Sequence, residues 1–176
     1  MSELRPFDKL PLLNTAGVLL LGSEEGCRER VARALLQAPK PFQVKIHMAP
    51  GLPLPPEGEH RRPRFDLVLV LVSLDSQASL TAARASLPRL DPHYFLGKLC
   101  FLALGAARPH MVERSAVRKL ADTHRSPLLF VQLDRPEDMD CAAQRLVNML
   151  QVSAGLLPGI SALYVGSLLQ SSLSWD

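Results

Sequence analysis

The residues of this chain best suited to chemistry form a short segment after its first apolar run. The segment consists of Gly22, Ser23, Glu24, Glu25, Gly26, Cys27, Arg28 and Glu29. A glycine-rich turn between a strand and a helix can bind phosphate, because its backbone N–H groups surround the anion and a lysine neutralises it. The motif for such a turn is G-x-x-x-x-G-K-[ST], in which the final hydroxyl binds Mg²⁺. The question is whether this segment fits that motif.

Neither alignment of the segment with the motif succeeds. In the frame that begins at Gly22, the second glycine is replaced by Cys27. The lysine and hydroxyl positions of that frame hold Arg28 and Glu29. In the frame that begins at Gly17, the second glycine is correct, but Ser23 and Glu24 replace the lysine and the hydroxyl.

The carboxylates of Glu24 and Glu25 also oppose phosphate binding. A carboxylate about 5 Å from one phosphate charge costs about 3 kcal/mol at an effective dielectric constant near 20. We therefore interpret residues 22–29 as the start of a helix with Ser23 as its N-cap, because serine is favoured there and acidic residues suit the first turn. The sequence predicts no bound nucleotide, no cofactor and no catalytic residue at this loop.

The other motifs of a nucleotide switch are missing as well. We expect the D-x-x-G motif before the strand that begins at Phe65, where the chain is rich in proline and has no such tetrapeptide. The turn that would read guanine with N-K-x-D is Gly105–Pro109, which has neither asparagine nor a carboxylate. The S-A-K turn would follow Phe130-Val131, where the chain reads Gln132-Leu133-Asp134.

Other chemistry finds little support in the sequence. The three cysteines (Cys27, Cys100 and Cys141) are far apart and form no C-x-x-C pair, so no zinc or other metal site and no disulfide is indicated. Cys100 falls in an apolar strand, where a thiol is usually inert. Asp66 and Asp75 flank the most apolar strand, where a turn and a helix cap explain them. Single histidines with surface or cap roles are expected at His47, His60, His93, His110 and His124.

The elements that position these residues alternate between apolar runs and helical patterns, which is typical of a parallel sheet covered on both faces. Strands are expected over 17–21, 42–48, 65–72, 98–104 and 128–133. The strand over 42–48 alternates in polarity and is placed near an edge. Helices are expected over 24–37, 76–90, 112–123 and 136–155, with Pro88 loosening the last turn of the second. Residues 50–64 form a proline-rich loop, and a C-terminal helix covers 160–171.

This order predicts one domain over residues 1–176 with a doubly wound, mostly parallel α/β sheet of the small-GTPase-like, three-layer type and an extra C-terminal helix. The formal charge of +3 and the 21% of charged residues do not suggest a nucleic-acid binder. The basic stretch His60–Arg64 has no interleaved aromatic residue, so direct DNA contact is not expected. The longest apolar runs have six residues, far below the roughly 20 that span a bilayer, so no membrane partner is expected.

Two segments carry more large apolar residues than one packed face requires. In the terminal helix these residues include Leu163, Tyr164 and Leu168, and in the turn after the second helix they are Tyr94, Phe95 and Leu96. Exposed apolar clusters mark partner surfaces, so these six residues are the candidate partner-binding residues. Packing within the same domain is the alternative, and it is favoured for Tyr164 and Leu168 but not for Leu96 and Leu163.

Many short blocks of the chain resemble the centromere protein M family, over nearly its whole length. The blocks are Arg5-Pro6, Asp8–Pro11, Leu13–Ala16, Arg62–Arg64, Asp66-Leu67, Phe95–Lys98, Cys100–Ala103, Ser126–Leu129, Gln144–Val147, Pro158-Gly159, Ser161–Leu163 and Ser167–Leu169. The chain departs from the family pattern mainly at 39–41, 106–114 and 135–140.

The resemblance implies a pseudo-GTPase fold that binds no nucleotide and a non-enzymatic subunit of the inner kinetochore. It implies assembly with centromere proteins H, I and K, with the helical-repeat protein I as the main contact. It also implies a nuclear location, at the kinetochore of the chromosome's centromere, and a part in mitotic cell division. A divergent active GTPase or other NTPase is the alternative.

Overall fold

The computed structural model describes all residues except 1–3, 5, 7–8, 56–61, 106–108 and 158–176. Its strands form one sheet with the order β2-β1-β3-β4-β5, in which every pairing is parallel. The strands are β1 (Thr15–Leu21), β2 (Gln43–Ala49), β3 (Leu67–Ser73), β4 (Leu99–Gly105) and β5 (Leu128–Gln132). This order is one of the two common orders of doubly wound sheets. The α/β prediction is confirmed, and so is the edge position of β2.

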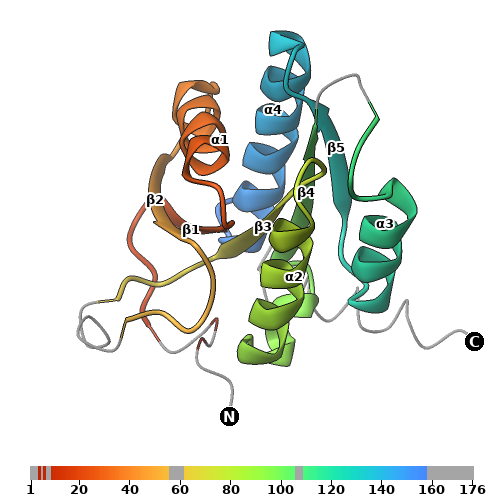
Figure 1. The fold of residues 1–176 in the computed structure, drawn as a ribbon. Coiled ribbons are helices and arrows are strands. Elements are labelled where there is room, and N and C mark those ends of the chain that lie inside the picture. The colour runs from red at the N-terminus through yellow and green to blue at the C-terminus, as the bar shows by residue number, and fades with distance from the viewer. Residues whose placement is uncertain (1–3, 5, 7–8, 56–61, 106–108, 158–176) are drawn as a thin grey trace, which may run out of the picture.

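Helices cover both faces of the sheet. The α-helices are α1 (Glu25–Gln37), α2 (Gln77–Ser86), α3 (Arg114–Thr123) and α4 (Pro136–Ser153). Helices α1 and α4 lie on one face, and α2 and α3 lie on the other (Figure 1). The predicted helix over 160–171 and part of the predicted 50–64 loop lie outside the described residues.

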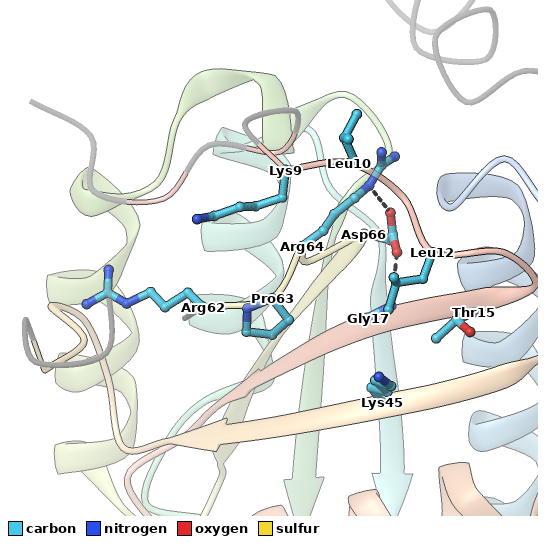
Figure 2. Close-up of a pocket in the computed structure, with 10 residues that line it drawn as sticks. All are labelled: Lys9, Leu10, Leu12, Thr15, Gly17, Lys45, Arg62, Pro63, Arg64 and Asp66. Carbon is cyan, nitrogen blue, oxygen red and sulfur yellow. Dashed lines mark hydrogen bonds and ion pairs between the residues drawn. The ribbon is translucent and has the colours of Figure 1, made fainter. Parts of the chain in front are cut away.

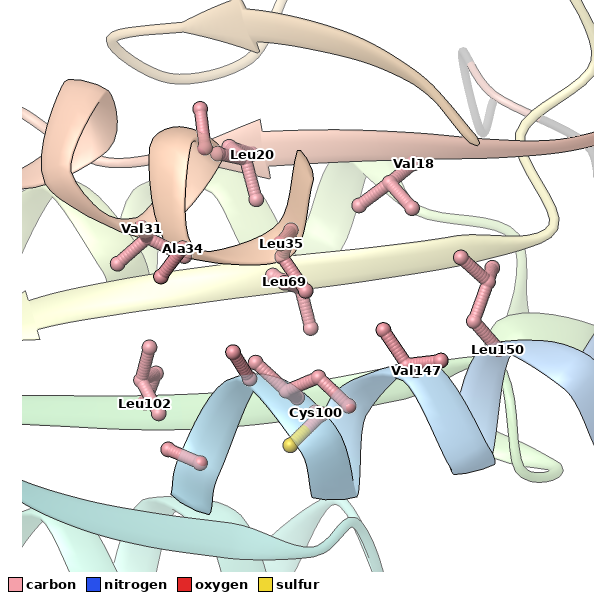
Figure 3. Close-up of a cluster of buried hydrophobic side chains, with 14 of the residues drawn as sticks. Val18, Leu20, Val31, Ala34, Leu35, Leu69, Cys100, Leu102, Val147 and Leu150 are labelled. Carbon is pink, nitrogen blue, oxygen red and sulfur yellow. The ribbon is translucent and has the colours of Figure 1, made fainter. Parts of the chain in front are cut away.

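Two hydrophobic clusters, one on each face, hold the layers together. All seven residues of β3 and all seven of β4 are buried, which explains why both strands are apolar throughout. In β1 the side chains alternate: Val18 and Leu20 pack with α1 and α4 (Figure 3), whereas Leu19 and Leu21 pack with the opposite layer. The sheet is therefore a buried platform, and exposed side chains are confined mainly to its edges, loops and outer helix faces.

Two helix ends match their sequence signals. Pro88 ends α2, and the chain tightens there into the 3₁₀ turn η2 (Leu87–Arg89). Helix α4 ends at Ser153, and Gly155, two residues later, has a φ of 73° and donates its N–H to the carbonyl of Val152. The N–H of Leu156 bonds to the carbonyl of Gln151, which completes a Schellman motif.

A buried lysine joins the end of α4 to the start of β4. The ammonium of Lys98 donates to the carbonyl of Ser153, in the last turn of α4. Burial lowers the pKa of Lys98 to about 8. A cation at a helix C-terminus is favourable, so this contact fixes where α4 crosses the amino end of the sheet.

Within the described part of the chain, no helix has both the length and the hydropathy that a bilayer span requires.

Candidate functional site

Ligands of doubly wound sheets bind at the carboxyl ends of the strands, where the connections from the central strand leave in opposite directions. In this sheet that point lies between β1 and β3, at Gly22 and at the turn Leu74–Ser76. All strands are parallel, so residues that precede β3 lie at the opposite side of the sheet, where the amino ends of the strands meet. The expectation that a phosphate-sensing motif would precede Phe65 was therefore wrong in position. The chain has no D-x-x-G tetrapeptide at any position.

The Gly22 loop uses its own polar groups internally. The N–H of Gly22 donates to the carbonyl of Ala49 at 3.1 Å, and its carbonyl accepts a hydrogen bond from the guanidinium of Arg28. Arg28 stands where a phosphate-binding loop has its lysine, and here it bonds to the loop backbone. A Cβ added to Gly22 would lie 3.0 Å from the Cβ of Leu71, so packing against β3 accounts for this glycine. The loop offers neither its cation nor its first amide to a phosphate.

The start of α1 differs from the prediction at one residue. The N-cap is Glu24, which makes no capping hydrogen bond with its side chain, and Ser23 is exposed outside the helix. The carboxylate of Glu24 instead accepts a hydrogen bond from the thiol of Cys27 at 3.4 Å. The pKa of Cys27 is raised to about 11, mainly by burial and to a smaller extent by this hydrogen bond, so the thiol stays protonated and unreactive. The prediction that Ser23 caps the helix was wrong, because the helix begins at Glu25 and its N-cap position falls on Glu24.

The turn after β3 also differs from the prediction. Ser76 is the N-cap of α2, and its hydroxyl accepts from the N–H of Ser79. Asp75, expected as the helix cap, instead lies 3.5 Å from the imidazole of His110. The ring of His110 lies over Gly105, where an added Cβ would approach it to 2.6 Å. These contacts join the turn after β3 to the end of β4 and to His110.

The remaining titratable residues are scattered. His93 bonds to Asp91, and His124 bonds to the carbonyl of Leu120 at the end of α3, as expected for surface and cap roles. His47 lies exposed on β2, and His60 lies outside the described residues. Cys100 is buried, and burial raises its pKa to about 12. Among the described residues, no three His, Cys, Asp or Glu side chains are grouped to hold a metal ion.

The candidate partner residues before β4 do not share one environment. Tyr94 is completely buried and directs its hydroxyl toward the carbonyl of Phe65 at 3.4 Å. The expectation that Tyr94 is an exposed partner contact was therefore wrong. Phe95 and Leu96 are half-buried and remain accessible, whereas Leu163, Tyr164 and Leu168 lie outside the described residues.

The burial of Tyr94 has a signal in the sequence. Asp91 and Pro92 begin a second 3₁₀ turn, η3 (Pro92–Phe95), in which the Asp91 carboxylate accepts from the N–H of His93 at 2.9 Å. Leu87, Leu90 and Tyr94 are spaced by three and four residues, and all three are buried in the same cluster. The apolar face of α2 thus continues through the turns into Tyr94.

A cavity of about 280 Å³ lies at the opposite, amino-terminal edge of the sheet (Figure 2). Asp66 is buried there, where its carboxylate accepts from the N–H of Gly17 at 2.9 Å and pairs with Arg64 at 2.7 Å. The expected turn role of Asp66 is confirmed, because this carboxylate joins β1 to the chain that leads into β3. The cavity itself was missed, because its lining comes from four separate stretches of sequence.

Comparison with known proteins gives one consistent result. The family described as Centromere protein M (CENP-M) matches residues 1–172. A protein named Centromere protein M from Xenopus laevis is 54% identical over all of this chain and 99% of its own length. Proteins of the same name from Homo sapiens and Danio rerio are 46% and 44% identical, over 98% and 100% of this chain and 96% of their own lengths.

Proposed function

Because this chain belongs to the centromere protein M family, we propose that it is a non-catalytic structural subunit of the inner kinetochore. It is a centromere protein and acts in the nucleus, on the chromosome. In the proposal it assembles with centromere proteins H, I and K and docks the helical-repeat protein I as its main contact. In this role it supports kinetochore assembly at centromeres and the segregation of chromosomes.

The observation that carries the proposal is the closed Gly22 loop. A triphosphate requires free amides and a free cation, and it is repelled by carboxylates in the same loop. Here the guanidinium of Arg28 bonds to the carbonyl of Gly22, and Glu24 and Glu25 occupy the helix start. These contacts support a pseudo-GTPase, in which the sheet serves as a rigid scaffold.

The proposed partner surface combines the turn before β4 with the C-terminal segment. Phe95 and Leu96 are the accessible residues of the turn, and Tyr94 supports them from within the core. Leu163, Tyr164 and Leu168 complete the proposed surface. A helical-repeat partner presents ridged apolar faces, and aliphatic and aromatic side chains can pack between such ridges.

Leu96→Glu and Leu163→Glu are each expected to abolish co-purification with centromere protein I. A buried carboxylate in an apolar interface costs more than about 2 kcal/mol, which weakens binding at least about 30-fold. The measurement is size-exclusion chromatography of the purified chain with centromere protein I, followed by calorimetric titration.

The matched control is Leu36→Glu, because Leu36 is an exposed leucine on α1, 58% accessible and outside the proposed surface. It should bind as the unchanged chain does, and all three variants should keep the melting temperature of the unchanged chain. Normal binding by both Leu96→Glu and Leu163→Glu at micromolar concentration would contradict the proposed surface.

Calorimetric titration with GTP, GDP or ATP in the presence of Mg²⁺ is expected to give no binding heat. This measurement separates the proposal from the alternative, a divergent active NTPase. A crystal soaked in GTP and Mg²⁺ that held the nucleotide over residues 22–29 would refute the pseudo-GTPase proposal.

A further inference from the structure

The cavity at the amino edge of the sheet has no part in the proposed function. Its walls come from residues 9–12, from β1 and β2, and from residues 62–66 (Figure 2). It is lined by Lys9, Leu10, Leu12, Thr15, Gly17, Lys45, Arg62, Pro63, Arg64 and Asp66. Its volume of about 280 Å³ is just below the range of small-molecule sites, so it suits one or two side chains better than a cofactor.

Positive charge dominates this cavity. Lys9, Lys45, Arg62 and Arg64 line it from three separate segments, whereas Asp66 is its single carboxylate. Arg64 pairs with Asp66 at 2.7 Å, and Asp66 also accepts from the N–H of Gly17, so the negative charge is compensated within the protein. Lysines 9 and 45 then give the cavity a net positive field that favours an anionic ligand.

An apolar rim borders the same cavity. Leu10 is 90% exposed, Leu12 is 55% exposed and Leu13, next to it in sequence, is 96% exposed. Leu10 and Leu12 line the cavity, and exposed large aliphatic side chains that gather in this way are typical of a protein-binding surface. Such a patch contributes nothing to the binding of a phosphate backbone, which is recognised by charge and hydrogen bonds.

We propose that this cavity is a docking site for an acidic segment of a partner protein, with an aliphatic side chain as its anchor. The partner's carboxylates face Lys9 and Lys45, and its aliphatic side chain packs against Leu10 and Leu12. The site takes a protein segment rather than DNA because exposed leucines border it, and such side chains contribute nothing to the binding of a polyphosphate chain. Leu96, the described leucine of the surface proposed above for the helical partner, does not line the cavity.

The test uses the full chain and a fluorescein-labelled peptide of alternating glutamate and leucine as the probe. Fluorescence anisotropy should show binding in the micromolar range that weakens as salt is added, because exposed ion pairs are screened. Lys45→Glu and Leu12→Ser are each expected to weaken binding about tenfold, a change of about 1.4 kcal/mol. Lys9→Glu, in a segment without regular secondary structure, should give the same loss without altering β2.

The control is Lys119→Glu, which removes an exposed lysine of α3 on another side of the molecule and should leave binding unchanged. Equal binding of a lysine–leucine peptide would refute the charge argument, and equal binding of polyglutamate would refute the aliphatic anchor. Tight binding of duplex DNA that Lys45→Glu abolishes would identify a nucleic-acid site instead. Absence of peptide binding, or binding that Lys45→Glu and Leu12→Ser leave unchanged, would overturn the proposal.

Discussion

Replacing Tyr94 by alanine is expected to lower the free energy of unfolding by about 3–5 kcal/mol, as for other large buried aromatic residues. Tyr94 is fully buried among the residues that join η2 and η3 to the sheet, so its removal leaves a cavity between α2 and β4. Urea denaturation followed by circular dichroism measures the change. A loss of this size is a large part of the 5–15 kcal/mol that stabilises a typical domain.

Tyr94→Phe is the matched control, because it keeps the ring and removes only the hydroxyl, whose hydrogen bond to Phe65 is long at 3.4 Å. It should cost at most about 1 kcal/mol. If Tyr94→Ala instead kept full stability and lost only the binding of centromere protein I, Tyr94 would have to be a surface contact. The pair of variants therefore separates a core role from a partner-binding role.

Sequence periodicity predicted the strands whose burial matches the order of apolar and polar residues along them. The alternation in β2 placed it correctly at the edge, and the continuous apolar runs of β3 and β4 marked fully buried strands. Gly155 marked the end of α4 because its left-handed φ favours glycine. In each case the burial or the backbone conformation of a short segment determines which residue types it contains.

The helix starts show what local patterns cannot decide. Ser23, Asp75 and Ser76 all have side chains that can cap a helix, but only Ser76 does so in the structure. Asp75 lies 3.5 Å from the imidazole of His110 in another loop, and α1 begins one residue after the position that would make Ser23 its N-cap. The contact between Asp75 and His110 joins residues 35 apart in the sequence, so it is made only once the chain is folded.

The two sites were predictable to different degrees. Loss of the phosphate motif was visible because all its positions lie within residues 22–29, although the bond from Arg28 to the carbonyl of Gly22 was not. The amino-edge cavity combines Lys9, Lys45 and Arg64, which are brought together only by the pairing of β1 with β2 and β3. No spacing in the sequence indicates that these three residues lie around one cavity.

The approach of β1 to the chain before β3 leads to the second prediction, that Gly17→Ala loses at least about 4 kcal/mol of stability. A Cβ at position 17 would lie 2.1 Å from the backbone carbonyl oxygen of Arg64, and no side-chain rotation can relieve that overlap. Moving the two strands apart would also break two hydrogen bonds between Gly17 and Asp66. The N–H of Gly17 donates to the Asp66 carboxylate at 2.9 Å, and the N–H of Asp66 donates to the carbonyl of Gly17 at 2.8 Å. Soluble yield and the urea midpoint measure the effect.

Gly26→Ala is the matched control, because an added Cβ there has no neighbour within 4 Å and alanine favours the helix α1. It should raise stability by up to about 1 kcal/mol. The two substitutions are chemically identical, so the contrast isolates the close contact between β1 and residue 64. If Gly17→Ala folded with unchanged stability, the backbone around Asp66 would have to be more open than the structure has it, and the cavity beside it would lose the rigid wall on which specific docking depends.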